Sequence, residues 1–223
     1  MMLKAAHQEK RPCSRQQITR IVKIALICVA ALAANRLFTT SLYFVGLPLF
    51  MDTVFTVAVT FAAGLIPGLT VALLGWVADG FQNAYFHPFV FVAVAEVLLV
   101  HRLKPVPSPQ PAPFVSHDPT FVADMKVAAK INTGARLALL YLVCVITLSV
   151  LGGITSFMVY TVGGREQFFF STIDTFKTGL LQSGSGVLAA DILSRIFVNT
   201  ADRFIVIFGG YFVSLGIRRL LKG

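Results

Sequence analysis

Two acidic residues, Asp52 and Asp79, lie within an otherwise apolar stretch that covers residues 50–83. A carboxylate near the centre of a membrane helix costs roughly 2.5–3.5 kcal/mol on insertion scales, so it lies near a helix end, pairs with a cation or serves a function. Trp76 comes one helical turn before Asp79 and offers a flat apolar ring beside the acid. This combination of carboxylates and an aromatic ring at helix ends is typical of a site for a small molecule.

Tyrosine and asparagine residues occupy similar positions near the ends of neighbouring apolar stretches. Their side chains supply hydrogen-bond donors, acceptors and ring faces, which a pocket needs in small number among apolar walls. Aromatic residues also mark the membrane–water interface in any membrane protein, so this alternative stays open for each of them taken singly. We predict a ligand site formed by Tyr43, Asp52, Trp76, Asp79, Asn83, Tyr85 and Asn199, with no catalytic and no metal-binding residue.

The composition indicates an all-α, polytopic membrane protein. Hydrophobic residues make up 56% of the 223 residues and charged residues 13%, and the mean hydropathy is +0.78. Soluble domains carry about 25% charged residues. Several apolar stretches approach the ~20 residues that a helix needs to cross the hydrocarbon core. The basic N-terminal tail precedes an apolar run without a small-residue cleavage site, so we expect the first helix to remain in the mature chain.

The periodicity of apolar residues predicts six membrane helices in one domain, residues 20–223, after a basic cytoplasmic tail, residues 1–19. The turn Ile66-Pro67-Gly68-Leu69 would join the second helix to the third, and a polar, amphipathic approach, 117–132, would precede the fifth. The expected helices are 20–40, 52–65, 69–81, 88–102, 134–160 and 202–220.

Two further segments interrupt this pattern. The Pro-rich stretch 103–116 cannot continue a helix and predicts an extended cytoplasmic linker. Residues 161–200 mix phenylalanines with polar residues and predict a helical, partly buried cap on the outer side. An interfacial helix that only lies on lipid is the alternative for this segment. Cys28 and Cys144 lie in apolar runs and the total of three cysteines is odd, so neither a disulfide framework nor a metal cluster is expected.

Basic residues predict the orientation, because Lys and Arg accumulate on the cytoplasmic side of membrane proteins. Six crossings with both termini inside place three basic segments in the cytoplasm: the N-terminal tail, the connection between helices four and five, and the C-terminus. The net charge of +9 therefore reflects topology. Nucleic-acid binding is not expected, since no basic patch is interleaved with exposed aromatic residues.

Small and charged residues within the helices indicate how the helices pack. Small residues recur at helical spacing in the second and third helices and are expected to pack these helices together. A charge inside the bundle needs a partner. For Glu96 the open alternatives are His101, Arg102 or a hydrogen bond across the bundle, and for Arg203 they are Asp191, Asp52 or an anionic group of a ligand.

Enzyme signatures are missing from the sequence. There is no Walker-type phosphate loop, no His-Glu-x-x-His and no Gly-x-Ser-x-Gly, and the four histidines are scattered. We expect neither enzymatic activity nor a cofactor. Transport against a gradient would need an ion gradient or another subunit as its source of energy.

Several features occur together in this chain: the six-helix layout, the Ala-rich first helix, the run D-T-V-F-T … G-L-I-P-G-L … A-D over helices two and three, and the opening T-A-D-R-F-I-V of the last helix. In these features the chain resembles the substrate-binding S components of energy-coupling factor (ECF) transporters, which are small vitamin-binding membrane subunits. The resemblance covers most of the chain in layout and is specific over 50–79 and around Asp202. The Pro-rich linker and the long segment before the last helix depart from a minimal S component.

The resemblance implies a multi-pass protein of a prokaryotic cytoplasmic membrane that captures a vitamin-like solute on the outer side. Such a subunit then topples in the lipid bilayer against a transmembrane T component, which two ATPase subunits drive. A small-residue AxxxA pattern docks the first helix of the family onto the T component, and the matching residues here are Ala30 and Ala34. Any close-packed membrane helix can show this spacing, so close packing alone is the alternative. The identity of the solute does not follow from the resemblance.

Two other functions fit the same hydrophobic layout. One is a membrane sensor domain similar to the input regions of some histidine kinases. The other is a stand-alone ion-coupled carrier, in which Glu96 would be the coupling group.

Overall fold

The computed structural model describes residues 15–45, 51–80, 88–105, 119–162 and 172–222. All regular elements in these ranges are helical, which confirms the all-α prediction. They are α1 (Arg15–Val45), α2 (Val54–Ala63), α3 (Leu65–Gly80), α4 (Val90–Leu103), α5 (Pro119–Ser156) with a π-helical extension (Phe157–Val162), α6 (Thr172–Gln182) and α7 (Val187–Lys222).

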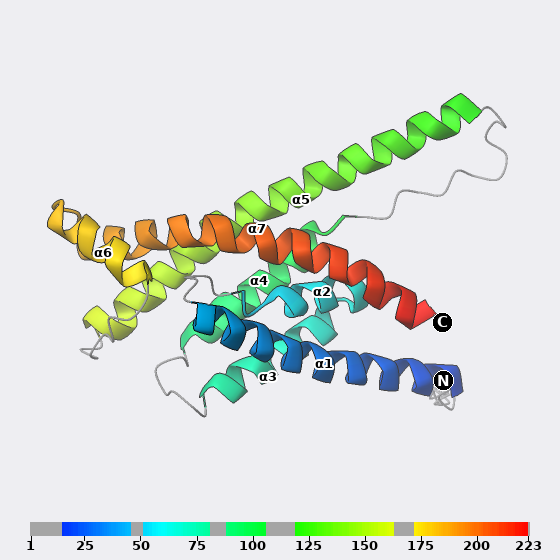
Figure 1. Cartoon of the computed structure of the whole chain (residues 1–223), viewed down its shortest axis with the longest axis horizontal. Helices are drawn as coiled ribbons and strands as arrows, with labels where there is room; N and C mark the ends of the chain where they lie inside the picture. Colours follow the sequence, from blue (N-terminus) through cyan, green and yellow to red (C-terminus); the bar gives the residue numbers. More distant parts are fainter. Residues whose placement is uncertain (1–14, 46–50, 81–87, 106–118, 163–171, 223) are drawn as a thin grey trace, which may run out of the picture.

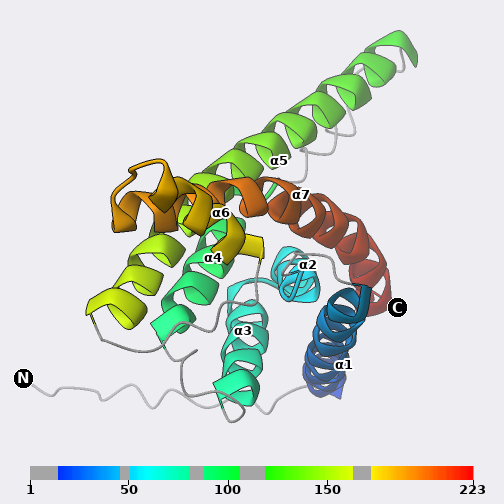
Figure 2. The same ribbon diagram turned by 60° about the vertical axis from the view of Figure 1, so that its left-hand side comes forward.

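The helices form one bundle in which α2 occupies the centre. Helix α2 contacts α1, α3, α4 and α7, and Figure 2 shows these helices around it. The consecutive residues Val57, Ala58, Val59 and Thr60 have no exposed surface. A helix buried on all sides is expected to be apolar all round, and α2 carries no charged residue; its two threonines, Thr56 and Thr60, are hydrogen-bonded.

Within the described ranges, three helices are long and apolar enough to cross a membrane, over Arg15–Ser41, Val127–Tyr160 and Val187–Lys222. Large apolar side chains cover their outward faces; Leu37 of α1 is 71% exposed and Phe212 of α7 is 67% exposed. Extensive exposed apolar surface marks contact with lipid or with another protein. Helices α2 and α3 are also apolar but shorter. With its 10 residues, α2 is about 15 Å long.

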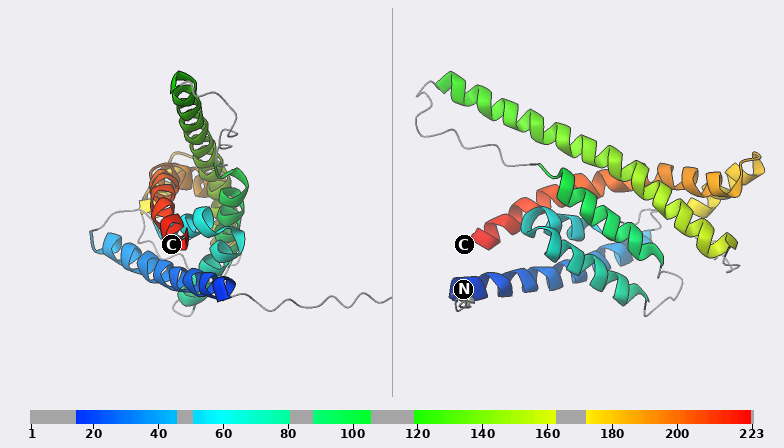
Figure 3. Two further views of the ribbon diagram at one scale, coloured as in Figure 1. Left: turned by 90° about the vertical axis from the view of Figure 1, so that its right-hand side faces the viewer. Right: turned by 180° about the vertical axis from the view of Figure 1, so that it is seen from behind.

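The first and last long helices share one end of the bundle. Figure 1 shows the first turn of α1 and the last turn of α7 at one end, and α4 ends and α5 begins toward this same end. In Figure 3 the first turns of α5 project away from the other helices.

The connection between α2 and α3 lies at Gly64, so the predicted turn at Ile66–Leu69 is wrong. Gly64 has a φ of 99°, and glycine adopts this left-handed region without the steric penalty that a side chain brings. Pro67 belongs to the first turn of α3. Its missing N–H would have no intrahelical partner at that position in any case, so proline is compatible with a helix start.

The fifth and last helices begin earlier than predicted. Helix α5 starts at Pro119, so the predicted polar approach, 117–132, is largely part of it. Helix α7 starts at Val187 rather than at Asp202, so residues 187–200 of the predicted cap, 161–200, belong to α7. Of the rest of the cap, 161–162 end the π-helical extension, 172–182 form α6, and 163–171 lie outside the described residues. Ser194 and Asn199 are buried against other helices, where their polarity does not interrupt the helix.

The other predicted elements differ in smaller ways. Helix α1 is longer at both ends than the predicted 20–40, and α4 matches the predicted 88–102 within two residues. Helix α2 begins and ends two residues inside the predicted 52–65. Of the predicted linker, residues 106–116 lie outside the described residues, as do residues 1–14 of the predicted tail.

Glycines bring the central helices into close contact. Gly68 of α3 lies against Thr60 of α2, which confirms the packing predicted for the small residues of these helices. Gly210 of α7 lies against Val54 and Val57 of α2, and a Cβ atom at Gly210 would be 3.0 Å from the Val54 carbonyl oxygen. Such approach of backbones is how membrane helices gain van der Waals contact.

Candidate functional site

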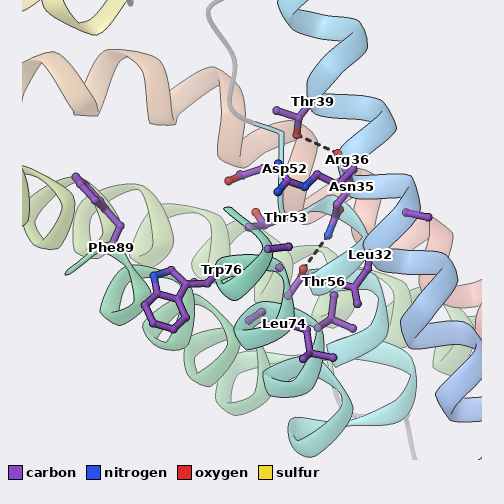
Figure 4. A pocket seen from close by; sticks show the side chains of 16 residues that line it. Leu32, Asn35, Arg36, Thr39, Asp52, Thr53, Thr56, Leu74, Trp76 and Phe89 are labelled. Atoms are coloured by element: carbon purple, nitrogen blue, oxygen red, sulfur yellow. Dashed lines mark hydrogen bonds between the residues drawn. The ribbon is translucent and has the colours of Figure 1, made fainter. Parts of the chain in front are cut away.

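A pocket of about 640 Å³ opens between α1, α2, α3 and the residues that precede and begin α4 (Figure 4). Its volume falls within the range of about 300–1,000 Å³ that is typical of small-molecule sites. The polar wall comprises Asn35, Arg36, Thr39, Asp52, Thr53 and Thr56, and the apolar wall includes Leu32, Val71, Leu74, Trp76 and Phe89.

The turn before α2 presents an acid to this pocket. Asp52 is exposed, and it lines the pocket. The residues on either side are fixed by α7: the Met51 N–H donates to Asp202 Oδ1 at 2.8 Å, and Arg203 Nη1 donates to Thr53 Oγ1 at 3.1 Å. Met51 has a φ of 21°, which non-glycine residues seldom adopt. Helix α7 therefore holds the turn in the conformation that exposes Asp52.

A buried charge network lies next to this turn. The Arg203 guanidinium of α7 donates to Glu96 of α4 and to Asp202 of its own helix. All three side chains are buried, with Glu96 at 2% and Asp202 at 0% exposure. One cation thus serves two buried carboxylates, and the network ties α4 and α7 to the turn through Thr53.

The network answers the two questions about partners that the sequence left open. Glu96 pairs with Arg203, not with His101 or Arg102. Asp191 pairs with Lys177 of α6, at 2.8 Å, and not with Arg203. Glu96 and Arg203 are 107 positions apart in the sequence. The pair therefore becomes visible only in the structure, where α4 and α7 bring the two side chains together.

Helix α1 supplies the polar wall opposite the turn. Asn35 Nδ2 donates to Thr56 Oγ1 at 3.0 Å, and Asn35 Oδ1 accepts from the Phe55 N–H at 3.0 Å. The first N–H groups of a helix lack intrahelical partners, so Asn35 caps α2 from a neighbouring helix. The predicted ligand set omitted Asn35, Arg36 and Thr39, although the spacing of Asn35 and Thr39 places both on one face of a helix.

Aromatic rings form the side of the pocket near α3 and α4. Trp76 is half-buried on α3, and Phe89 precedes α4. The Arg195 guanidinium of α7 lies 5.3 Å from the centroid of the Phe89 ring, which is cation–π distance. Figure 4 shows Trp76 and Phe89 on the side of the pocket away from α1.

The structure brings only part of the predicted ligand set together. Asp52 and Trp76 line the same pocket. Tyr43 and Asp79 belong to α1 and α3, but their side chains lie outside what the structure describes, and Asn83 and Tyr85 lie outside the described residues altogether. Asn199, on α7, does not line the pocket: its amide donates to Ser149 Oγ of α5 at 2.9 Å.

A second polar cluster joins α6 to the bundle. Lys177 and Asp191 are 4% and 1% exposed, and Ser156 Oγ donates to Asp191 Oδ1 at 3.2 Å. Within the described part of the chain, no group of three or more His, Cys, Asp and Glu side chains is placed to hold a metal ion.

Comparison with protein-family models, curated proteins and solved structures finds no match for this chain. The pocket and the arrangement of the helices are therefore the basis of the functional proposal.

Proposed function

We propose that the protein is the substrate-capture subunit of an ECF-type importer. It would cross the cytoplasmic membrane six times, bind a small vitamin-like solute on the outer side and deliver it inward with a T component and two ATPase subunits. The observation that supports solute capture is the pocket of about 640 Å³, with one polar and one aromatic wall, inside a bundle that includes three helices of membrane length. The ECF assignment itself follows from the sequence resemblance over 50–79 and around Asp202.

The directions of the helices support six crossings by α1, α2, α3, α4, α5 and α7. The start of α1, the end of α4, the start of α5 and the end of α7 lie toward one end of the bundle (Figure 1), and the segments next to them in the sequence carry many basic residues. Accumulation of Lys and Arg identifies that end as cytoplasmic. Helix α2 is too short to cross ~30 Å of hydrocarbon alone, but protein surrounds it, and irregular backbone is tolerated at membrane depth where it is enclosed or lines a cavity.

The pocket lies in the opposite, outer half of the bundle. Its α1 residues, from Leu32 to Thr39, belong to the second half of that helix, and its α3 residues Trp76 and Ala78 lie near the end of α3. Phe89 precedes the start of α4. These three positions are the helix ends farthest from the basic segments, so a solute would enter from outside the cell.

Analysis of co-purified small molecules tests the capture function. The full-length protein and a Trp76→Ala variant would be purified in the same mild detergent, with Phe212→Ala as a control that removes an exposed ring from α7, outside the pocket. Mass spectrometry should find a stoichiometric organic compound in the wild type and the control, and much less in Trp76→Ala. Equal amounts in all three samples, or no compound above background in the wild type, would contradict capture in this pocket.

A further inference from the structure

We propose that the captured solute carries a positive charge and that Asp52 is its anionic contact. This inference rests on the proposed capture function and adds the chemical class of the solute. It follows from the position of Asp52, from the balance of charges around it and from the aromatic wall opposite.

The position of Asp52 is set by its neighbours. Met51 and Thr53 both hydrogen-bond to α7, through Asp202 and Arg203. The backbone on each side of Asp52 is therefore held, and the carboxylate lines the pocket instead of packing into the core. A carboxylate that is held at a pocket wall needs no reorganisation to meet a cation, which reduces the cost of binding.

The charges around Asp52 leave the site negative. Next to the turn, three described carboxylates, from Asp52, Glu96 and Asp202, surround one guanidinium, from Arg203. Two other guanidiniums lie farther along the walls: Arg36 lines the pocket from α1, and Arg195 lies against Phe89. Arg203 already donates to both buried carboxylates. Coulomb interactions are several-fold stronger beside a protein interior than in water, so an anionic solute would be repelled, and a cationic solute would supply the missing charge.

The aromatic wall suits the same class of ligand. Trp76 and Phe89 line the pocket, and Arg195 already lies over the Phe89 ring. A cation near the face of an aromatic ring is attracted by its quadrupole, most strongly for tryptophan, so Trp76 is the ring that we assign to the ligand. The pocket can therefore contact an organic cation in two ways, through the Asp52 carboxylate and through a ring face. A flat-ring ammonium or a ring with a quaternary nitrogen fits this arrangement best.

The single tryptophan makes the pocket directly observable. Because the chain contains only one Trp, its fluorescence reports on Trp76 alone. The detergent-purified full chain would be titrated with benzyltrimethylammonium, phenylacetamide and phenylacetate, which share a benzyl group and differ in charge. We expect a saturable change for the ammonium at a concentration about tenfold or more below that for phenylacetamide, equivalent to about 1.4 kcal/mol or more, and no saturation with phenylacetate.

An isosteric variant identifies the residue responsible. Asp52→Asn should weaken benzyltrimethylammonium binding about tenfold and leave phenylacetamide binding unchanged, because only the charge is removed. Asp174→Asn is the matched control: it makes the same change on α6, away from the lining of the pocket. It should bind all three compounds as the wild type does.

The outcomes separate this inference from the capture function. Tighter binding of phenylacetate, or unchanged selectivity in Asp52→Asn, would overturn the assignment of charge. Equal binding of all three compounds would also overturn it while leaving solute capture intact. A lack of any saturable response would count against a cationic solute as well. The mass spectrometry of co-purified compounds would then test the capture function separately.

Discussion

Arg203 is the residue on which the geometry of the site depends. Its guanidinium joins Glu96 of α4, Asp202 of α7 and Thr53 of the turn before α2. A buried ion pair contributes little net stability compared with apolar residues of the same shape, yet breaking it is costly because a charge stays buried without a partner. The network therefore serves mainly to hold the turn that carries Asp52 in place.

Replacement of Arg203 should be more damaging than replacement of either single acid. Arg203→Met would leave Glu96 and Asp202 buried without their cation, and we expect a loss of about 3–5 kcal/mol. Glu96→Gln should cost less, since Arg203 keeps Asp202 as a partner. Thermal unfolding in detergent would measure both, with Arg219→Met, at an exposed position of α7, as control. A smaller loss for Arg203→Met than for Glu96→Gln would contradict this role.

Asn35 provides the second test at the level of single residues. Asn35→Leu removes one buried and one partly buried hydrogen bond and leaves the Thr56 hydroxyl and the Phe55 N–H without this partner. The expected destabilisation is about 1–3 kcal/mol, together with weaker retention of the co-purified compound, because Asn35 lines the pocket. The matched change Asn132→Leu affects an exposed residue of α5 that bonds only one turn away, to Arg136. Equal thermal stability of both variants would contradict the capping role.

The pairing of α2 with α7 is the central interaction between elements. Helix α2 is short and enclosed, and α7 contacts it along much of its length (Figure 2). Arg218 of α7 also donates to the Phe61 carbonyl oxygen at 2.7 Å, which satisfies an acceptor near the C-terminal end of α2. Helix α7 thus supports α2 at both ends, through Arg203 and Arg218.

Two glycines of α7 allow a controlled test of this packing. A Cβ atom at Gly210 would lie 2.9 Å from Val57 Cγ1, whereas one at Gly216 would meet open space. Gly210→Val should therefore destabilise the protein by about 1–3 kcal/mol through overpacking. Gly216→Val carries the same cost of helix propensity without the clash, so the difference between their unfolding temperatures isolates the contact. Equal shifts would mean that α7 does not press on α2.

At the scale of the whole molecule, the crossing by α7 and its orientation in the membrane can be tested with two single cysteines. After replacement of Cys13, Cys28 and Cys144, the variants Ser183→Cys and Lys222→Cys would be treated with a membrane-impermeant maleimide on intact cells. Ser183 follows α6, at the end that we propose to be outside, and Lys222 closes α7. We expect labelling of Ser183→Cys in intact cells and of Lys222→Cys only after permeabilisation. The reverse pattern would mean the opposite orientation, and labelling of both positions from one side would exclude an odd number of crossings between them.

The proposed docking to a T component also concerns the molecule as a whole. Ala30 is exposed on α1 and Ala34 is half-buried. A bulky side chain at Ala30 would therefore point toward a partner protein and disturb the core of the bundle little. Ala30→Trp and Ala34→Trp should abolish co-purification with a T component and keep solute binding. Phe212→Trp changes an exposed position of α7 instead and should leave association intact. Normal co-purification of both alanine variants would refute docking through this face.

Local patterns were sufficient for much of this description. Hydropathy and helical spacing are properties of neighbouring residues, so they predicted helical structure throughout and located α1 and α4 closely. The cost of burying a carboxylate singled out Asp52 and the amphipathic ring singled out Trp76, and the structure places both at one pocket.

Contacts between distant segments lie beyond such patterns. The partner of Glu96 could not be read locally because Arg203 is 107 positions away, and Asn35 became part of the site only through its bonds to Phe55 and Thr56. The start of α7 was misplaced because residues 187–200 were assigned to a separate helical cap, whereas they continue directly into the last helix and bury Ser194 and Asn199 against its neighbours. Sequence periodicity thus reports which residues are helical, whereas the partners of buried polar groups depend on packing, because hydrogen bonds and ion pairs form across helices that the chain brings together from far apart.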